Sequence, residues 1–444
     1  MTSLGPIFAD DLARVKPGDR LRLTISAQTS DAAALAQAAL EARARGERVL
    51  VVCADPADVP RLAQEMPWFE PKLDVRPLPD WETLPYDVLS PQEELVSERL
   101  EALYRLTAPT GGADVLLTSA VTASQRLSPV SYIGANTFFF HQGEQISLTT
   151  LQKRLAAAGY ANVKQVLAAG EFAVRGSIVD VFPMGSERPF RLDFFDDEIE
   201  SIRWFDVDTQ RSMESAEEIR LLPGHEFPVD PEALLAFRQR WRREFAGDPK
   251  KSIVYCDIEK EILPPGIEYY LPLFFDETAA LTDYLPPNAR VFLLGDIEAA
   301  LQAFGRDMAS RYKVLAADPQ RPALAPERIW LKPEEFFKSL ANFARFTVEK
   351  KENAEDLKRL TGIEVDRKSQ NPVGKLLERT RESAMKGVRT LIAAPSAGRM
   401  ETMSQLLRTG GLSVEEFPDW QTFLDADSAL GIAAAPLFSG ASTT

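Results

Sequence analysis

Apolar and polar residues follow one another along residues 22–55 in the order of a strand, a loop, a helix and a second strand. The second strand is expected at Val49–Ala54, and a further apolar strand is expected at Asp114–Thr118. A helix is expected after the run from Ser90 to Glu93, which has the form of a capping box with proline at the first helical position. Residues 1–136 are therefore predicted to form an α/β domain.

The pattern changes over residues 137–222, where a helix at Leu148–Ala158, ended by Gly159, precedes a β-rich stretch. Residues 223–351 return to mixed helices and strands. The polar and charged residues 352–364 indicate a linker. The remaining residues, 365–444, predict a small α/β domain, with helices at Gly374–Lys386 and Gly398–Arg408 around a strand at Val388–Ala394. We find no internal repeat in this pattern.

Two apolar segments of the β-rich stretch, Val174–Phe182 and Phe190–Phe195, predict an antiparallel hairpin. If Phe182 lies opposite Phe190, the even-numbered positions form the buried face, because side chains alternate along a strand. That face holds Val174, Ile178, Phe182, Phe190, Leu192 and Phe194. The odd-numbered face holds Arg175, Ser177, Val179, Val181, Arg191, Asp193 and Phe195.

Arg175, Arg191 and Phe195 make the odd-numbered face a candidate binding surface. Arginine and aromatic side chains are enriched among the residues that dominate protein–protein affinity. The alternative is purely structural: Phe195 would pack under a neighbouring helix, and the arginines would be solvated or paired with Asp193. The strand pattern alone leaves both interpretations open.

The composition narrows the class of protein. The chain of 444 residues has a net charge of −15, which argues against a broad nucleic-acid-binding surface. We find neither a long apolar run nor a secretory leader, so we expect a cytoplasmic protein without a membrane span. Two histidines are too few for a convincing zinc site or catalytic triad. Cys53 and Cys256 are expected to be buried, reduced thiols.

A nucleotide site is not expected. A phosphate loop needs glycines that let backbone N–H groups surround the phosphates, together with a lysine and a Ser or Thr. The loop at Ser26–Asp31 has neither glycine nor lysine, and the pair Gly374-Lys375 is followed by Leu376. The acidic stretches at Asp276-Glu277 and Asp196–Glu198 are interpreted as turns rather than metal sites. We therefore expect no cofactor and no catalytic residue.

Residues 170–212 resemble the signature shared by bacterial transcription–repair coupling factors and by UvrB of the excision-repair nuclease. Residues 80–106, 221–230 and 263–286 are more similar to the coupling factors. The resemblance implies a degenerate helicase-like (RecA-like) α/β domain without a phosphate loop, built from residues 1–136 and 223–351. It also implies an inserted α+β domain at residues 137–222.

The resemblance also implies a function. The inserted domain would recruit UvrA, the damage sensor of the excision nuclease, through Arg175, Arg191 and Phe195, and this chain would be a non-catalytic recruiting module. The DNA-clamping hairpin of UvrB is not expected, since Tyr86 is the only tyrosine between Trp81 and Arg99.

RNA polymerase binding, DNA translocation driven by ATP, and a C-terminal domain that masks the UvrA site would lie beyond residue 444. The alternatives are a DNA-dependent NTPase with an unrecognised site and a DNA-binding structural module. No role is indicated for residues 365–444.

Overall fold

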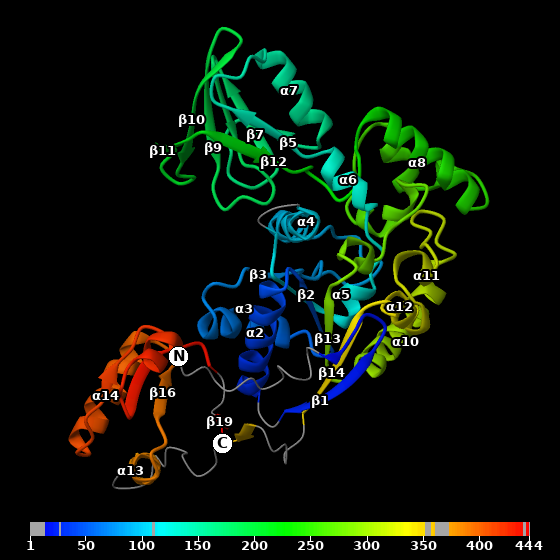
Figure 1. Cartoon of the computed structure of the whole chain (residues 1–444). Coiled ribbons are helices and arrows are strands. Elements are labelled where there is room, and N and C mark those ends of the chain that lie inside the picture. The colour runs from blue at the N-terminus through cyan, green and yellow to red at the C-terminus, as the bar shows by residue number, and fades with distance from the viewer. Residues whose placement is uncertain are drawn as a thin grey trace.

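The structure is a computed structural model and describes residues 14–25, 28–108, 112–350, 357–359, 373–437 and 441–443. A six-stranded sheet lies at its centre (Figure 1). Its order is β1 (Arg20–Ile25), β14 (Ala344–Lys350), β13 (Arg290–Leu294), β2 (Val49–Cys53), β4 (Val115–Ser119) and β3 (Val75–Pro77). All neighbouring strands are parallel, so two segments far apart in the sequence build one sheet.

Helices cover both faces of this sheet, as a sheet with fully buried strands requires. On one face, α2 (Gln28–Ala44) and α3 (Asp58–Phe69) pack over Val51, Phe292 and Phe346. The other face carries α4 (Glu93–Thr107), α5 (Ala120–Ser124), α10 (Ile297–Leu315) and α12 (Pro333–Ser339).

A second six-stranded sheet is formed by residues that lie in sequence between β4 and β13, the two central strands where the first and second segments of the central sheet end and begin. Its order is β11 (Ser212–Ala216), β10 (Glu198–Phe205), β9 (Phe190–Phe195), β8 (Ile178–Val181), β7 (Glu171–Arg175) and β6 (Ala161–Asn162). Helix α7 (Leu148–Ala157) packs on one face of it through Leu151 and Leu155. The chain enters through β5 (Phe138–His141) and leaves through β12 (Glu218–Leu221), and these two strands pair with each other.

Short helices join the inserted sheet to the central sheet around an aromatic core. They are α6 (Val130–Ala135), α8 (Pro231–Glu244), α9 (Ile253–Glu259), α11 (Pro326–Ile329) and the 3₁₀ helices η1 (Pro249–Lys251), η2 (Ile267–Leu273) and η3 (Leu281–Tyr284). Trp81, Trp241 and Trp330 are buried in this core.

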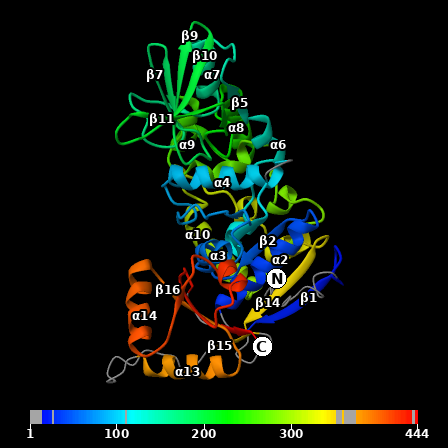
Figure 2. The ribbon, with the colours of Figure 1, turned by 60° about the vertical axis from the view of Figure 1, so that its left-hand side comes forward.

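The C-terminal unit holds a three-stranded parallel sheet in the order β16 (Thr390–Ala394), β18 (Leu430–Ala434), β17 (Glu415–Glu416). Its helices are α13 (Gly374–Met385), α14 (Ala397–Thr409) and α15 (Trp420–Asp425). In Figure 2 this unit lies beside α3 of the central domain. Separately, β15 (Leu357–Arg359), which falls within the predicted linker, pairs with β19 (Ala441–Thr443).

Most long elements lie where the apolar pattern predicts them, which confirms the strands near residues 49 and 114 and the helices near 148, 374 and 398. The prediction of a capping box at Ser90 is wrong. Helix α4 begins at Glu93 without a side-chain cap, because the Ser90 hydroxyl donates to Glu268 (2.9 Å) and accepts from the Gly266 backbone N–H (3.0 Å). A contact distant in sequence therefore takes the group that would have capped the helix.

The cysteine prediction holds in part. Cys53 is buried in β2 and both thiols are free, but Cys256 on α9 is only half-buried, so the prediction of two buried thiols is wrong there. Within the ranges given above, no helix is long and apolar enough to cross a membrane.

Candidate partner-binding face of the inserted sheet

The predicted hairpin differs from the observed one in its register. Gly176 adopts a left-handed φ of +63°, so Gly176 and Ser177 form a tight turn that breaks the predicted strand into β7 and β8. Strand β8 then pairs with β9 so that Val181 lies opposite Phe190 and Asp180 lies opposite Arg191.

The expected pairing of Phe182 with Phe190 is therefore wrong by one residue. A slip of one residue turns every side chain of a strand to the other face. Val179 and Val181, expected on the outer face, are buried, and Phe182 lies outside β8. The assignment along β9 is unaffected: Phe190, Leu192 and Phe194 are buried in the core that includes α7.

The three predicted binding residues nevertheless lie on one face of the sheet. Arg175 on β7 lies opposite Ile178 on β8, and Ile178 lies opposite Asp193 on β9. Arg191 and Phe195 lie two residues before and after Asp193, so their side chains are on the same face of the sheet. The Phe195 ring is 68% exposed, the Arg175 side chain is 49% exposed and the Arg191 side chain is 14% exposed. The ring thus faces solvent instead of packing under a helix of the described chain.

The buried side chain of Asp180 forms hydrogen bonds with both Arg175 and Arg191. Its carboxylate is fully buried and accepts hydrogen bonds from Arg191 Nε (2.7 Å) and Nη2 (3.0 Å) and from Arg175 Nη2. The hydrogen bond to Asp180 raises the pKa of Arg191. The Arg191 guanidinium also lies 5.0 Å from the centre of the Phe205 ring.

Sequence reasoning missed Asp180, because the assumed register placed it on the buried face. Asp193, which the structural alternative offered as the arginines' partner, instead accepts a hydrogen bond from Ser201 (2.9 Å). The signal that could have found Asp180 is the sequence Arg175-Gly176-Ser177, since a glycine inside a strand pattern often marks a turn or bulge. A turn there shifts the alternation by one position.

The neighbouring strand extends this face. Arg203 on β10 lies directly opposite Arg191 and is exposed. The acidic residues Asp196 and Asp197 form the turn between β9 and β10, as predicted, and Asp196 has a left-handed φ of 53°. The face therefore offers guanidinium donors beside an exposed aromatic ring. Such a surface suits a partner that supplies carboxylates and an apolar pocket.

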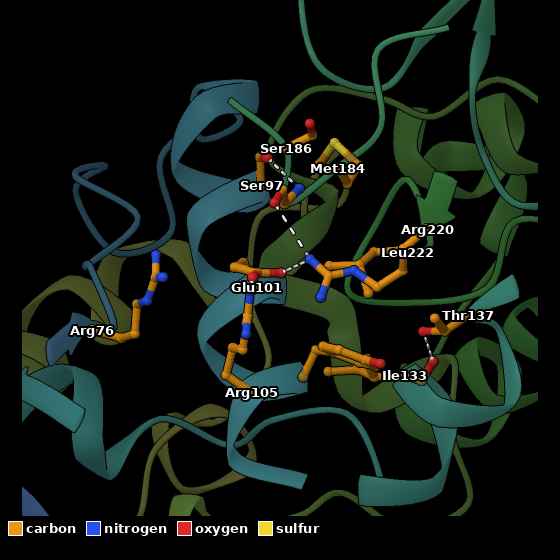
Figure 3. A network of polar contacts seen from close by, with 12 residues as sticks. Arg76, Ser97, Glu101, Arg105, Ile133, Thr137, Met184, Ser186, Arg220 and Leu222 are labelled. Carbon is orange, nitrogen blue, oxygen red and sulfur yellow. Dashed lines mark hydrogen bonds and ion pairs between the residues drawn. The ribbon is translucent and has the colours of Figure 1, made fainter. Parts of the chain in front are cut away.

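The inserted sheet is fixed to the central domain by a polar junction on α4 (Figure 3). Arg220 forms an ion pair with Glu101, which also accepts from Arg105 Nε (2.7 Å). The backbone N–H of Gly185 donates to Ser97 Oγ (2.8 Å). Gly185 has a φ of +74°, and a side chain there would collide with Leu222 and Glu101. The inserted domain, which carries the candidate binding face, is thus held to α4 by an ion pair and a backbone hydrogen bond.

The loop at Ser26–Asp31 lies partly outside the described residues: Ser26 and Ala27 are not described, and α2 begins at Gln28. Asp31 in the first turn of α2 is buried and accepts two hydrogen bonds from Arg61 of α3, at 2.8 and 2.7 Å. Arg61 also pairs with Asp58 (2.7 Å) and Glu65 (2.5 Å), and these contacts raise its pKa.

Of the two acidic stretches, Asp276 forms an ion pair with Arg240 at 2.6 Å and is otherwise exposed to solvent. This contact gives Asp276 an ordinary surface role. Helix α13 begins at Gly374, so Lys375 lies in the first turn of a helix rather than in a glycine-rich loop.

Fold and site together define a multidomain α/β protein whose inserted sheet presents arginines and an exposed aromatic ring. Residues 138–227 match a family model described as the UvrB interaction domain, and residues 384–444 match one described as the MFD D3 domain.

Full-length relatives agree with these two matches. The chain is 42% identical over 298 residues to the transcription-repair-coupling factor of Escherichia coli, covering 67% of this chain and 26% of the relative. It is 40% identical over 344 residues to that of Haemophilus influenzae, covering 75% and 29%, and 32% identical over 216 residues to that of Bacillus subtilis, covering 45% and 18%.

The chain belongs to the transcription-repair-coupling factor family and corresponds to its N-terminal region. The matched part of the chain spans 26%, 29% and 18% of the length of these three relatives.

Proposed function

We propose that this chain is a non-catalytic recruiting module of transcription-coupled nucleotide excision repair, and that its inserted domain binds UvrA of the excision nuclease. The match of residues 138–227 to the UvrB interaction domain supports this partner. The observation that carries the proposal is that Arg175, Arg191 and Phe195 lie on one face of the sheet, with Arg175 and Phe195 exposed and Arg191 fixed by the buried Asp180.

Asp180 would prepare this face for binding. An arginine side chain loses considerable conformational freedom when it is fixed in an interface. Because Asp180 already fixes the Arg191 guanidinium, this side chain would lose little further conformational entropy when the partner binds. Arg175 Nη2 donates to Asp180 while about half of the side chain stays exposed, so it keeps donors for a carboxylate of UvrA. Phe195 would supply the apolar anchor.

The rest of the chain would serve as a scaffold. We propose that residues 1–136 and 223–351 form a degenerate helicase-like domain, with the inserted domain at 137–222, a linker at 352–364 and a small domain at 365–444. The cluster around Asp31 supports the loss of nucleotide binding, because its three carboxylates outnumber the single cation Arg61 and would repel phosphates near the start of α2. RNA polymerase binding, the ATP-driven motor and the masking of the UvrA site would belong to parts of the full protein beyond residue 444.

The test is a pull-down of UvrA by the chain. Arg191→Ala and Phe195→Ala should each weaken binding by roughly tenfold or more, equivalent to about 1.4 kcal/mol. Arg154→Ala on α7 and Phe139→Ala on β5 are matched controls, because both side chains are exposed on other elements of the inserted domain. Unchanged binding of both test variants, with the fold intact, would remove the proposal.

A further inference from the structure

The C-terminal unit repeats the strand order of the first half of the central domain. In the central domain, β2 and β3 both pair in parallel with β4, which lies between them. In the C-terminal unit, β16 and β17 both pair in parallel with β18, which again lies between them. The elements also follow in the same sequence: α2–β2–α3–β3–α4–β4 in one unit and α13–β16–α14–β17–α15–β18 in the other.

The corner between the first helix and the first strand is the same in both units. Gly46 and Gly387 end their helices with left-handed φ values of +69° and +71°. Gly46 N–H donates to Arg43 O (2.9 Å) and Glu47 N–H donates to Ala42 O (2.9 Å). The counterparts are Gly387 N–H to Ala384 O (3.0 Å) and Val388 N–H to Ser383 O (2.9 Å). Both corners have the paired hydrogen bonds of a Schellman motif.

An arginine two residues after each glycine makes the same long-range contact. Arg48 donates to the carbonyl oxygens of Arg105 (2.7 Å), Leu106 and Ala108 (2.9 Å) at the C-terminal end of α4. Arg389 donates to those of Phe423, Leu424 (3.1 Å) and Ser428 (3.0 Å) at the C-terminal end of α15. In each unit a cation thus satisfies the free carbonyl groups of the helix before the third strand.

The sequence after the second strand is also shared. Val75, Leu78, Pro79-Asp80-Trp81, Thr83 and Leu84 correspond in spacing to Val414, Phe417, Pro418-Asp419-Trp420, Thr422 and Phe423. These shared features argue against the expectation of no internal repeat. The apolar pattern hid the repeat, because α15 is much shorter than α4 and the segments before these helices differ in length.

We propose that residues 374–434 are a shortened second copy of the unit at residues 28–119, and that the Pro-Asp-Trp corner is the docking element of both copies. In the first copy, Trp81 Nε1 donates to Glu226 Oε1 (3.2 Å), and its ring meets Tyr269 edge-on at 5.4 Å. Both contacted residues lie outside the copy, in the segment that follows the inserted domain.

In the second copy, the corner docks on the C-terminal end of α3. The Trp420 ring lies 6.0 Å from Trp68 and 5.8 Å from Phe69, centre to centre. Gln421 Nε2 donates to Glu70 Oε1 (3.2 Å) and to Phe69 O (3.4 Å). The surface formed by Trp68, Phe69 and Glu70 thus takes an aromatic and amide partner, and the partner is this chain's own C-terminal unit.

The second docking contact is the weaker of the two. Trp81 is 3% exposed and its indole N–H is bonded, whereas Trp420 stays half-buried. Trp68 Nε1 is buried without a hydrogen-bond partner among the described residues, which costs free energy in the docked state. Burial also raises the pKa of Glu70, which means that its charged form is partly desolvated there. The contact that holds the C-terminal unit is therefore less buried and less fully hydrogen-bonded than the contact of Trp81.

The test measures docking by cross-linking. Glu70→Cys and Gln421→Cys, in a Cys256→Ser background, place two thiols where the native side-chain tips meet. A short bismaleimide is preferable to a disulfide, since the shorter cysteine side chains would not bring two sulfur atoms into bonding distance. We expect rapid cross-linking within one chain.

Trp420→Ala and Trp68→Ala should each lower the cross-linking rate by about tenfold or more. Leu406→Ala is the matched control, because this exposed apolar side chain lies on α14, outside the helix α15 that carries Trp420. Trp68 belongs to the first copy, so its variant cannot act by unfolding the second. No cross-link in the intact chain, or an unchanged rate with Trp68→Ala, would overturn the docking role.

Discussion

Two clusters of this chain combine arginine and carboxylate side chains, but one has an excess of carboxylates and the other an excess of arginines. Between α2 and α3, the single cation Arg61 meets three carboxylates, those of Asp31, Asp58 and Glu65, and the whole cluster is buried. On the inserted sheet, the single buried carboxylate of Asp180 meets two arginines: the Arg175 side chain is half-exposed, whereas the Arg191 side chain is largely buried. The first cluster is enclosed in the protein, whereas the second extends to the surface through Arg175.

This difference distinguishes a structural cluster from a candidate binding cluster. Buried ions are costly unless every one is paired, so the Arg61 cluster is suited to fixing α2 against α3. The Asp180 cluster also fixes its arginines, but it leaves donors of Arg175 and an exposed Phe195 on the surface. The parallel fold of the central sheet alone would predict a ligand site at the carboxyl ends of its strands, near α2. The exposure of side chains instead favours a binding site on the inserted sheet.

Breaking the closed cluster should give the largest effect. Arg61→Met would leave three buried carboxylates without this cation, and we expect the free energy of unfolding to fall by about 3–5 kcal/mol. Urea denaturation at constant pH measures this loss. Arg45→Met is the control, since Arg45 forms a more exposed ion pair with Glu47. A loss below about 1 kcal/mol would show that the cluster is not structural.

Breaking the open cluster should affect binding more than stability. With Asp180→Asn, Arg175 can turn to water and Arg191 keeps its hydrogen bonds to Gln210 O and Ser212 Oγ, so we expect a stability loss of only about 1–2 kcal/mol. Affinity for UvrA should fall by roughly tenfold, because the guanidinium groups are no longer held in place.

Asp276→Asn serves as the control for this change, because it removes an acid paired with an arginine outside the inserted domain. The affinity is measured by a titration of labelled UvrA. Wild-type affinity in the folded Asp180→Asn variant would contradict the positioning role of Asp180.

The smallest expected effect is the effect of added nucleotide on thermal stability. With a carboxylate buried at the start of α2, ATP and magnesium should not shift the thermal unfolding midpoint. A ligand at a hundred times its dissociation constant would stabilise the folded state by about 2.7 kcal/mol, which thermal melting detects readily. A clear rise in the midpoint would mean that the strand ends still bind nucleotide and that the comparison fails.

The sequence predicted the parts of this fold that depend on local apolar patterns. Strands β2 and β4 are fully buried apolar runs, and such runs are recognised without knowing their neighbours. The register of β8 depends on the φ of Gly176 and on the turn to β9, which the alternation of side chains does not encode. Ser90 likewise contacts residues far away in sequence, so no local rule assigns its role.

The candidate site shows the same division. Arg191 and Phe195 were placed correctly relative to each other, because they lie on one uninterrupted strand. Arg175 lies on that face as well, but only because two errors cancel: the turn at Gly176 and the register slip each shift the face once. Asp180 lies between those two shifts and was therefore assigned to the wrong face.

Hydrogen exchange of the chain with and without UvrA tests the central claim most directly. Backbone amides of β7, β8 and β9, between residues 171 and 198, should exchange more slowly in the complex. Amides of α2 and α3 should be unchanged, because the Arg61 cluster faces no partner in this account. Protection confined to α2, α3 or the C-terminal unit, with none on β7–β9, would contradict the proposed binding face.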